Sequence, residues 1–163
     1  MKEAYFTEES IQQTADEMLA ALSKKGKKRR LTFAPQRAAL LILDMQDYFL
    51  QADSHAYIPS AAAIVPLLIR LEEQFLHHHR PVFLTRHLNT EENAGNMNTW
   101  WRDLITAHHP QGRLSSTFLD REVELLTKTQ YDAFFETDLE DQLRARDVNQ
   151  VLIGGVMTHL CCE

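Results

Sequence analysis

The chain has 163 residues, of which 44% are hydrophobic and 25% are charged, a balance that suits one globular domain with a sizeable core. A formal net charge of −6 argues against nucleic acid as the main partner. No apolar run reaches the roughly 20 residues that span a bilayer, and no signal-peptide stretch is recognisable. The two cysteines are adjacent and make no disulfide framework. We therefore expect a cytoplasmic protein that binds neither membranes nor nucleic acid.

The N-terminal part of the chain is predicted to be an arm separate from the main domain. The stretch Glu8–Ser23 has apolar residues at spacings of three and four, which is typical of an amphipathic helix: Ile11, Ala15, Met18, Leu19 and Leu22. Residues 24–30 form a basic run, which could be a nucleic-acid or targeting patch. A solvated linker is the favoured interpretation. We therefore expect an arm and linker over residues 1–32 and one domain over residues 33–163.

The rest of the chain alternates apolar strands with helices. Strands are predicted at residues 38–44, 81–85, 124–127 and 151–153, and helices at 59–75 and 138–146. The continuous apolar run Ala38–Leu43 is typical of a strand that is buried on both faces of a parallel sheet. Strands that alternate with helices imply right-handed crossovers. The sequence therefore predicts a doubly wound α/β fold, with a mostly parallel sheet and helices on both faces.

The predicted helix at residues 59–75 has two features that bear on its packing. Its expected inner stripe consists of Ile64, Leu67, Leu68, Leu71 and Phe75. Because proline is favoured in the first turn of a helix, Pro66 suggests a true start nearer Val65.

Three reactive side chains follow predicted strands, and ligands bind beyond the carboxyl ends of strands in open parallel sheets. They are Asp44, Lys128 and one of the two cysteines after the Gly154–Gly155 turn. A thiol at the start of a helix, close to an ammonium group, would favour its thiolate. Asp44 could take the thiol proton and later return it to a leaving group. Backbone N–H groups of the turn could hold an oxyanion. Each residue also has an ordinary structural interpretation, as a cap, a solvated lysine or a core cysteine.

Three segments then resemble the isochorismatase-like (cysteine hydrolase) superfamily over roughly residues 33–163. They are Leu41–Phe49 (LILDMQDYF), Lys128 with Tyr131–Phe134 (YDAF), and Gly155–Cys161 (GVMTHLC). The resemblance implies the doubly wound α/β fold, a homo-oligomer, and Asp44, Lys128 and Cys161 as the catalytic set. It also implies a cis Val156–Met157 peptide, and a further helix and strands that would make this chain a C-terminally incomplete fragment.

The chain resembles two branches of that superfamily, the isochorismatases and the amidases, which use different chemistry. Residues 33–49 look most like siderophore-type isochorismatases, which split a vinyl ether and release pyruvate. In that branch the position of Cys161 is commonly glycine, and His87 replaces a pocket glutamine. With Cys161 present, hydrolysis of a small amide or carbamoyl compound through a thioester is the favoured function. Isochorismate cleavage with Asp44 as acid is the first alternative, and a non-catalytic binding or scaffold domain is the second.

The expected substrate-binding residues lie at the same edge of the sheet: Gln46, Phe49, His87, Trp100, Met157 and Thr158. Residues 88–121 form a long polar excursion with two adjacent tryptophans, which is predicted to cap the pocket. Those tryptophans could instead make dimer contacts or belong to the core. The spacing of Asp53 and His55 matches one half of a metal site, with His87 as the only candidate to complete it. This signal is weak, and we expect no metal and no cofactor.

Overall fold

The computed structural model describes residues 2–23, 32–119, 121 and 123–163. Four parallel strands form one sheet in the order β3-β2-β1-β4. They are β1 (Ala38–Leu43), β2 (Val82–His87), β3 (Glu124–Lys128) and β4 (Gln150–Gly155). Each lies where the apolar pattern predicts a strand. The observed β2 continues to His87, and Lys128 is the last residue of β3 rather than the first residue after it.

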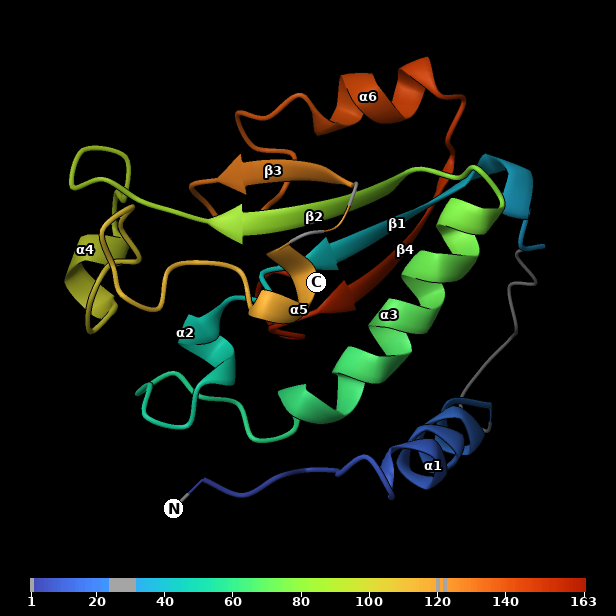
Figure 1. The fold of residues 1–163 in the computed structure, drawn as a ribbon, viewed down its shortest axis with the longest axis horizontal. Coiled ribbons are helices and arrows are strands. Elements are labelled where there is room, and N and C mark those ends of the chain that lie inside the picture. Colours follow the sequence, from blue (N-terminus) through green and yellow to red (C-terminus); the bar gives the residue numbers. More distant parts are fainter. Residues whose placement is uncertain (1, 24–31, 120, 122) are drawn as a thin grey trace.

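Helices cover both faces of this sheet, as Figure 1 shows, with α3 (Ala61–His77) on one side and α6 (Leu139–Ala145) on the other. Every residue of β1 is buried. Because side chains alternate along a strand, its even-numbered residues pack in the same core cluster as α3, and its odd-numbered residues pack with α6. The predicted doubly wound α/β fold with a parallel sheet is confirmed.

The start of α3 that Pro66 suggested is wrong, and its predicted inner face is only partly correct, because Leu68 and Phe75 are buried as expected but other members are not. The helix begins at Ala61, close to the predicted Pro59 rather than near Val65, and Pro66 is its sixth residue. Leu67 and Leu71 are each 38% exposed, whereas Glu72 is fully buried. The buried face is therefore rotated towards Glu72. An apolar pattern misses this because a carboxylate occupies a core position.

The N-terminal helix α1 (Ile11–Ser23) begins three residues later than the pattern predicts. Residues 8–10 form a turn that leads into the helix, in which the Ser10 hydroxyl accepts from the Thr7 N–H at 2.9 Å and the Thr7 carbonyl accepts from the Ile11 N–H at 2.9 Å. The predicted apolar stripe of α1 stays largely exposed at three positions, namely Met18, Leu19 and Leu22. The basic run before the domain lies outside the described residues.

Four short helices complete the described elements: η1 (Pro35–Arg37), α2 (Asp47–Leu50), α4 (Met97–Trp100) and α5 (Ser116–Leu119). The excursion after β2 therefore contains α4 and α5, and it is anchored through buried Ile105, whose carbonyl accepts from Asn89 N–H at 2.8 Å. Across the ranges that the structure describes, no helix combines the length and apolarity needed to cross a bilayer.

Candidate active site

The carboxyl ends of β1, β3 and β4 bring a carboxylate, an ammonium and a thiol together. Lys128 Nζ lies 2.8 Å from Asp44 Oδ2 and 3.4 Å from Cys161 Sγ. Parallel strands end at the same edge, so residues that are 84 and 33 positions from Lys128 in sequence meet there. The Lys128 ammonium thus contacts both of the other residues expected to be catalytic, Asp44 and Cys161.

The Asp44–Lys128 ion pair is closed to solvent. Asp44 is 0% exposed and Lys128 is 1% exposed. Ions in such a place need further hydrogen bonds to offset the loss of water. Thr85 donates to Asp44 Oδ1 at 2.6 Å, and Lys128 Nζ also donates to the Gln130 carbonyl at 3.0 Å. Sequence reasoning missed Thr85, although its position two residues before His87 on β2 places both on one face.

Unusual backbone conformations occur beside the site, at Asp44 and in the turn that leads to Cys161. Asp44 adopts φ 52°, in the left-handed region that costs a non-glycine residue about 1–2 kcal/mol. Gly155 has φ 116°, and a Cβ there would lie 2.2 Å from the Leu43 carbonyl oxygen, so only glycine fits beside β1. The following Val156–Met157 peptide is cis, as the family resemblance implies.

The Cys161 thiol differs from the sequence expectation of a stabilised thiolate. Its pKa is raised to about 12, mainly by burial and also by the Asp44 carboxylate, and Lys128 opposes these two effects only in part. Residues 158–162 form turns rather than the start of a helix, so the described residues supply no helix dipole to the thiol. Cys162 also has a raised pKa of about 11, again mainly through burial. The resting form of Cys161 is therefore the protonated thiol.

Gln46 uses both ends of its amide within the protein. Its Nε2 donates to the carbonyls of His87 at 3.1 Å and Gly112 at 2.7 Å, and its Oε1 accepts from the His87 N–H at 2.8 Å. This side chain therefore ties the end of β1 to the end of β2 and to the excursion beyond it.

His87 lies beneath a stack of aromatic rings. Its ring centroid is 5.4 Å from that of Trp101, which in turn stacks on Tyr48 at 6.1 Å and on Tyr131 at 6.2 Å. Trp101 also donates to the Tyr131 hydroxyl at 2.8 Å. Trp100, the tryptophan expected in the pocket, is 65% exposed. The excursion therefore places Trp101 against His87 and leaves Trp100 at the surface.

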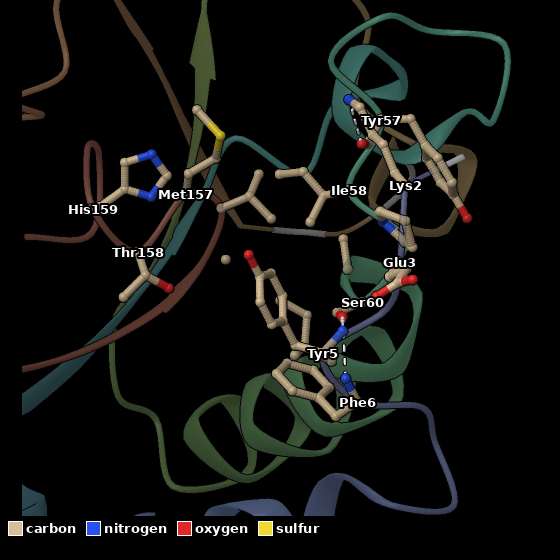
Figure 2. Close-up of a pocket in the computed structure, with 15 residues that line it drawn as sticks. Lys2, Glu3, Tyr5, Phe6, Tyr57, Ile58, Ser60, Met157, Thr158 and His159 are labelled. Carbon is tan, nitrogen blue, oxygen red and sulfur yellow. Dashed lines mark hydrogen bonds between the residues drawn. The ribbon is translucent and has the colours of Figure 1, made fainter.

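Two cavities adjoin the turn that carries Cys161, and Met157 lines both. The larger, about 470 Å³, lies between the N-terminal arm, the segment before α3 and this turn. Figure 2 shows Met157, Thr158 and His159 on one side of it. Phe49, Trp100 and Trp101 line the smaller cavity, about 290 Å³. Gln46 and His87 line neither of these two cavities.

The arm is held against the larger cavity by specific bonds. Lys2 Nζ donates to the carbonyls of His55 at 2.6 Å and Tyr57 at 2.9 Å. The buried Ser60 hydroxyl accepts from the Tyr5 N–H at 2.7 Å.

The residues considered for a metal site have other partners. Asp53 Oδ1 accepts from Gln111 at 2.8 Å. His55 Nε2 lies 3.1 Å from the Tyr48 hydroxyl and 3.4 Å from Asp103. Within the described ranges, no group of three or more His, Cys, Asp or Glu side chains could hold a metal ion.

A parallel α/β sheet that carries a carboxylate, an ammonium and a thiol at one edge has the layout of a cysteine-dependent hydrolase. The family model for the isochorismatase domain matches residues 38–163. The chain therefore belongs to the isochorismatase family.

Known proteins similar to this chain include an enterobactin synthase component, a nicotinamidase and a cysteine hydrolase. Enterobactin synthase component B of Escherichia coli (strain K12) is 32% identical over 133 residues, which cover 80% of this chain and 46% of that protein. Nicotinamidase 3 of Arabidopsis thaliana is 26% identical over 151 residues, covering 90% of this chain and 72% of that protein. The crystal structure of a cysteine hydrolase from Pseudomonas syringae pv. phaseolicola 1448A has a TM-score of 0.78 and 26% identity, covering 85% of this chain and 68% of that one. The chain thus spans about half the length of its enterobactin synthase relative.

Proposed function

We propose that the protein is a hydrolase that acts on a small amide or carbamoyl substrate through a thioester on Cys161. One observation carries this proposal: the Lys128 ammonium lies between the Asp44 carboxylate at 2.8 Å and the Cys161 sulfur at 3.4 Å. Base, nucleophile and charge stabiliser are thereby within reach of one reacting carbon. The similarity to a cysteine hydrolase of known structure supports the same assignment.

Acylation begins from the protonated Cys161 thiol. As the sulfur attacks the substrate carbonyl carbon, Asp44 takes the thiol proton, so no free thiolate has to accumulate. Lys128 stabilises the negative charge that develops on the sulfur. When the tetrahedral intermediate collapses, its carbon–nitrogen bond breaks, and Asp44 returns the proton to the leaving nitrogen. The products are an amine or ammonia and an acyl group on Cys161.

Deacylation uses the same groups in the reverse sense. Water attacks the thioester carbon while Asp44 accepts one of its protons, the carbon–sulfur bond breaks, and the proton passes back to the sulfur. The carboxylic or carbamic acid leaves, and the resting thiol is restored.

The backbone around Cys161 supports an oxyanion site. The Leu160 and Cys162 N–H groups both donate to the Met157 carbonyl at 3.2 Å. The N–H of Cys161 has no acceptor within the described ranges, so it can bind the oxyanion of the tetrahedral intermediate.

The adjacent cysteine supplies a matched control. Cys161→Ala should abolish hydrolysis across a panel of nicotinamide, pyrazinamide and carbamoyl compounds, and should prevent acyl adducts from appearing in the intact mass. Cys162→Ala should retain both, because Cys162 is not the sulfur beside Lys128. Full amidase activity in Cys161→Ala would rule out the thioester route.

A second candidate, isochorismate cleavage, is favoured by curated relatives such as the isochorismatase of Bacillus subtilis, 28% identical over 134 residues. Asp44 would then protonate the methylene carbon of the vinyl ether, and water would add to the resulting oxocarbenium carbon and return a proton to Asp44. The hemiketal would break at its carbon–oxygen bond to the ring, giving pyruvate and the ring alcohol, which takes the hemiketal proton, with Cys161 as a bystander. Pyruvate release that survives Cys161→Ala and is lost in Asp44→Asn would identify this route. The homo-oligomer, the cytoplasmic location and the domain boundary at residue 33 remain predictions.

A further inference from the structure

The smaller cavity beside the turn that carries Cys161 has walls from segments that are far apart in sequence. Tyr48 belongs to α2, Trp101 belongs to the excursion after β2, and Met157 lies four residues before Cys161. The cavity, about 290 Å³, is open to solvent and adjoins the turn of the proposed nucleophile. Its shape therefore depends on how the excursion is held against α2.

Trp101 belongs to a stack of rings. Its indole is nearly parallel to the Tyr48 ring, with an interplanar angle of 10° and centroids 6.1 Å apart. Its centroid is also 5.4 Å from that of His87, which pairs with Lys128 across the β2–β3 ladder. Stacked rings attract each other over a broad range of offsets, whereas a hydrogen bond favours one direction. The hydrogen-bond partner of the Tyr48 hydroxyl therefore helps to fix the arrangement of the stack.

Asp103, two residues after Trp101, supplies the acceptor for this hydroxyl. Tyr48 is 2% exposed, and its hydroxyl donates to Asp103 Oδ1 at 2.9 Å. His109 Nε2 lies 3.2 Å from Asp103 Oδ2. His109 Nδ1 accepts from the Gln111 N–H at 3.2 Å, so Nε2 bears the hydrogen of the neutral ring and donates to the carboxylate. Both carboxylate oxygens of Asp103 are therefore hydrogen-bonded.

His55 extends the same network to the segment before α3. Its Nε2 lies 3.1 Å from the Tyr48 hydroxyl oxygen. The single hydroxyl proton of Tyr48 is directed at Asp103, so His55 donates to the Tyr48 oxygen. Although burial raises it, hydrogen bonds from His109 and Tyr48 hold the pKa of Asp103 below its usual range, which keeps this carboxylate charged. Asp103 lines neither cavity beside the turn of Cys161, so it can affect a ligand there only through the rings that it holds.

We propose that Asp103 is a positioning residue that holds Tyr48 and Trp101 in place as one wall of the site for the acyl part of the substrate. This inference rests on the proposed amide hydrolysis and adds the cavity in which the acyl group lies. A volume of about 290 Å³ suits a small molecule rather than a peptide. Asp103 does not touch the substrate and acts through Tyr48.

Fluorescence tests the positioning without any activity, because Trp100 and Trp101 are the two tryptophans of the chain. In a Trp100→Phe background the tryptophan emission comes from Trp101 alone. Asp103→Ala should move this emission to longer wavelength and raise its quenching by acrylamide at least about twofold, because the indole becomes more exposed. Tyr48→Phe, which keeps the ring and loses the hydroxyl, should act in the same direction. Asp103→Glu, which keeps a carboxylate, should restore most of the original emission.

Glu92→Ala is the matched control, because it removes an exposed carboxylate from the same excursion. It should leave the Trp101 emission unchanged. Far-ultraviolet circular dichroism shows whether each variant is folded, and Tyr48→Phe decides the question if Asp103→Ala does not fold. Unchanged emission in Tyr48→Phe and Asp103→Ala would overturn the proposal, and so would an equal change in Glu92→Ala.

Ligand binding tests the acyl site itself. Nicotinamide and pyrazinamide are titrated against the Cys161→Ala, Trp100→Phe chain, with the Trp101 emission as the signal. The dissociation constant should rise at least about tenfold when Asp103→Ala is added, and Asp103→Glu should restore it. In the active chain, Asp103→Ala should raise KM for the same amides by a similar factor and leave kcat within about threefold, because the triad is unaffected. A loss of kcat with unchanged KM would contradict the proposal.

The two measurements separate failure of the acyl site from failure of the proposed function. Binding of these amides without turnover in the wild type would refute the proposed hydrolysis and support the site. Turnover without any response of the Trp101 emission to the amides would overturn the site and leave the hydrolase function standing. Absence of both binding and turnover would overturn both.

Discussion

Two ion pairs at opposite ends of β1 have the same geometry and very different surroundings. Lys128 Nζ and Asp44 Oδ2 are 2.8 Å apart, and both side chains are 0% exposed. Arg37, just before β1, lies 2.8 Å from Asp147, and these side chains are 47% and 82% exposed. The distance between the charged groups therefore does not determine how strongly each pair affects stability or neighbouring groups. Water screens the Arg37 pair, whereas the Asp44 pair has only protein groups around it.

This difference in exposure explains why the Asp44–Lys128 pair can influence a reacting group, whereas the Arg37–Asp147 pair acts only as a surface contact. Two charges without water interact strongly with each other and with any third group nearby, and here that group is the Cys161 sulfur, 3.4 Å from Lys128. The exposed pair fastens the start of β1 to the turn before β4 and has little influence beyond it.

Breaking the buried pair should have the largest effect on stability. Asp44→Asn or Lys128→Met leaves one buried charge without its partner, which should lower the free energy of unfolding by about 3–5 kcal/mol. Urea denaturation would measure this loss. The double variant should recover much of it, since neither charge then remains buried. Losses below about 1 kcal/mol in both single variants would contradict a solvent-free pair.

The reactivity of Cys161 should report the same burial. A pKa raised from 9.0 to about 12 gives about a thousandfold less thiolate at neutral pH than an ordinary thiol. Iodoacetamide alkylation, followed by intact mass in a Cys162→Ala background, should therefore accelerate from about pH 7 to 10 without a plateau. Because Asp44 raises this pKa and Lys128 lowers it, Asp44→Asn should react at least about tenfold faster and Lys128→Met more slowly. A wild-type plateau near pH 9 would contradict this prediction.

Glu72 offers a case between the two pairs, because it is fully buried while its partner Arg121, 3.3 Å away, is partly exposed. Burial raises the pKa of Glu72, and Arg121 opposes this only in part. The folded state therefore holds the Glu72 proton more tightly than the unfolded chain does, and stability is lost as the pH rises through the folded pKa. Glu72→Gln should therefore become more stable relative to the wild type as the pH rises from about 4 to 8, which urea denaturation at several pH values would measure. A pH-independent difference would show that this carboxyl does not titrate as a buried group.

The exposed pair should give the smallest effect. Arg37→Ala should change the free energy of unfolding by about 0.5 kcal/mol or less, and the change should shrink in about 1 M salt. Thermal unfolding at two salt concentrations measures both quantities. A loss comparable with that of Lys128→Met would show that distance, rather than exposure, decides the strength of these pairs.

Much of the fold could be predicted because periodicity is a local property. The fully apolar run Ala38–Leu43 indicated a strand buried on both faces, and the order of elements implied a parallel sheet. That topology alone was enough to predict that Asp44, Lys128 and a cysteine meet at one edge. The buried face of α3 was predicted only in part, because Glu72 occupies a core position where the pattern expects an apolar residue.

The sequence by itself therefore determined the alternation of strands and helices, the family, and which reactive residues follow the strands. Only the tertiary structure decided that the Cys161 thiol stays protonated, that Thr85 binds Asp44, and that Asn89 faces the His87 ring. The physical reason is that hydrophobic periodicity is encoded in neighbouring residues. Desolvation and hydrogen-bond partners depend instead on which distant segments come to lie against each group.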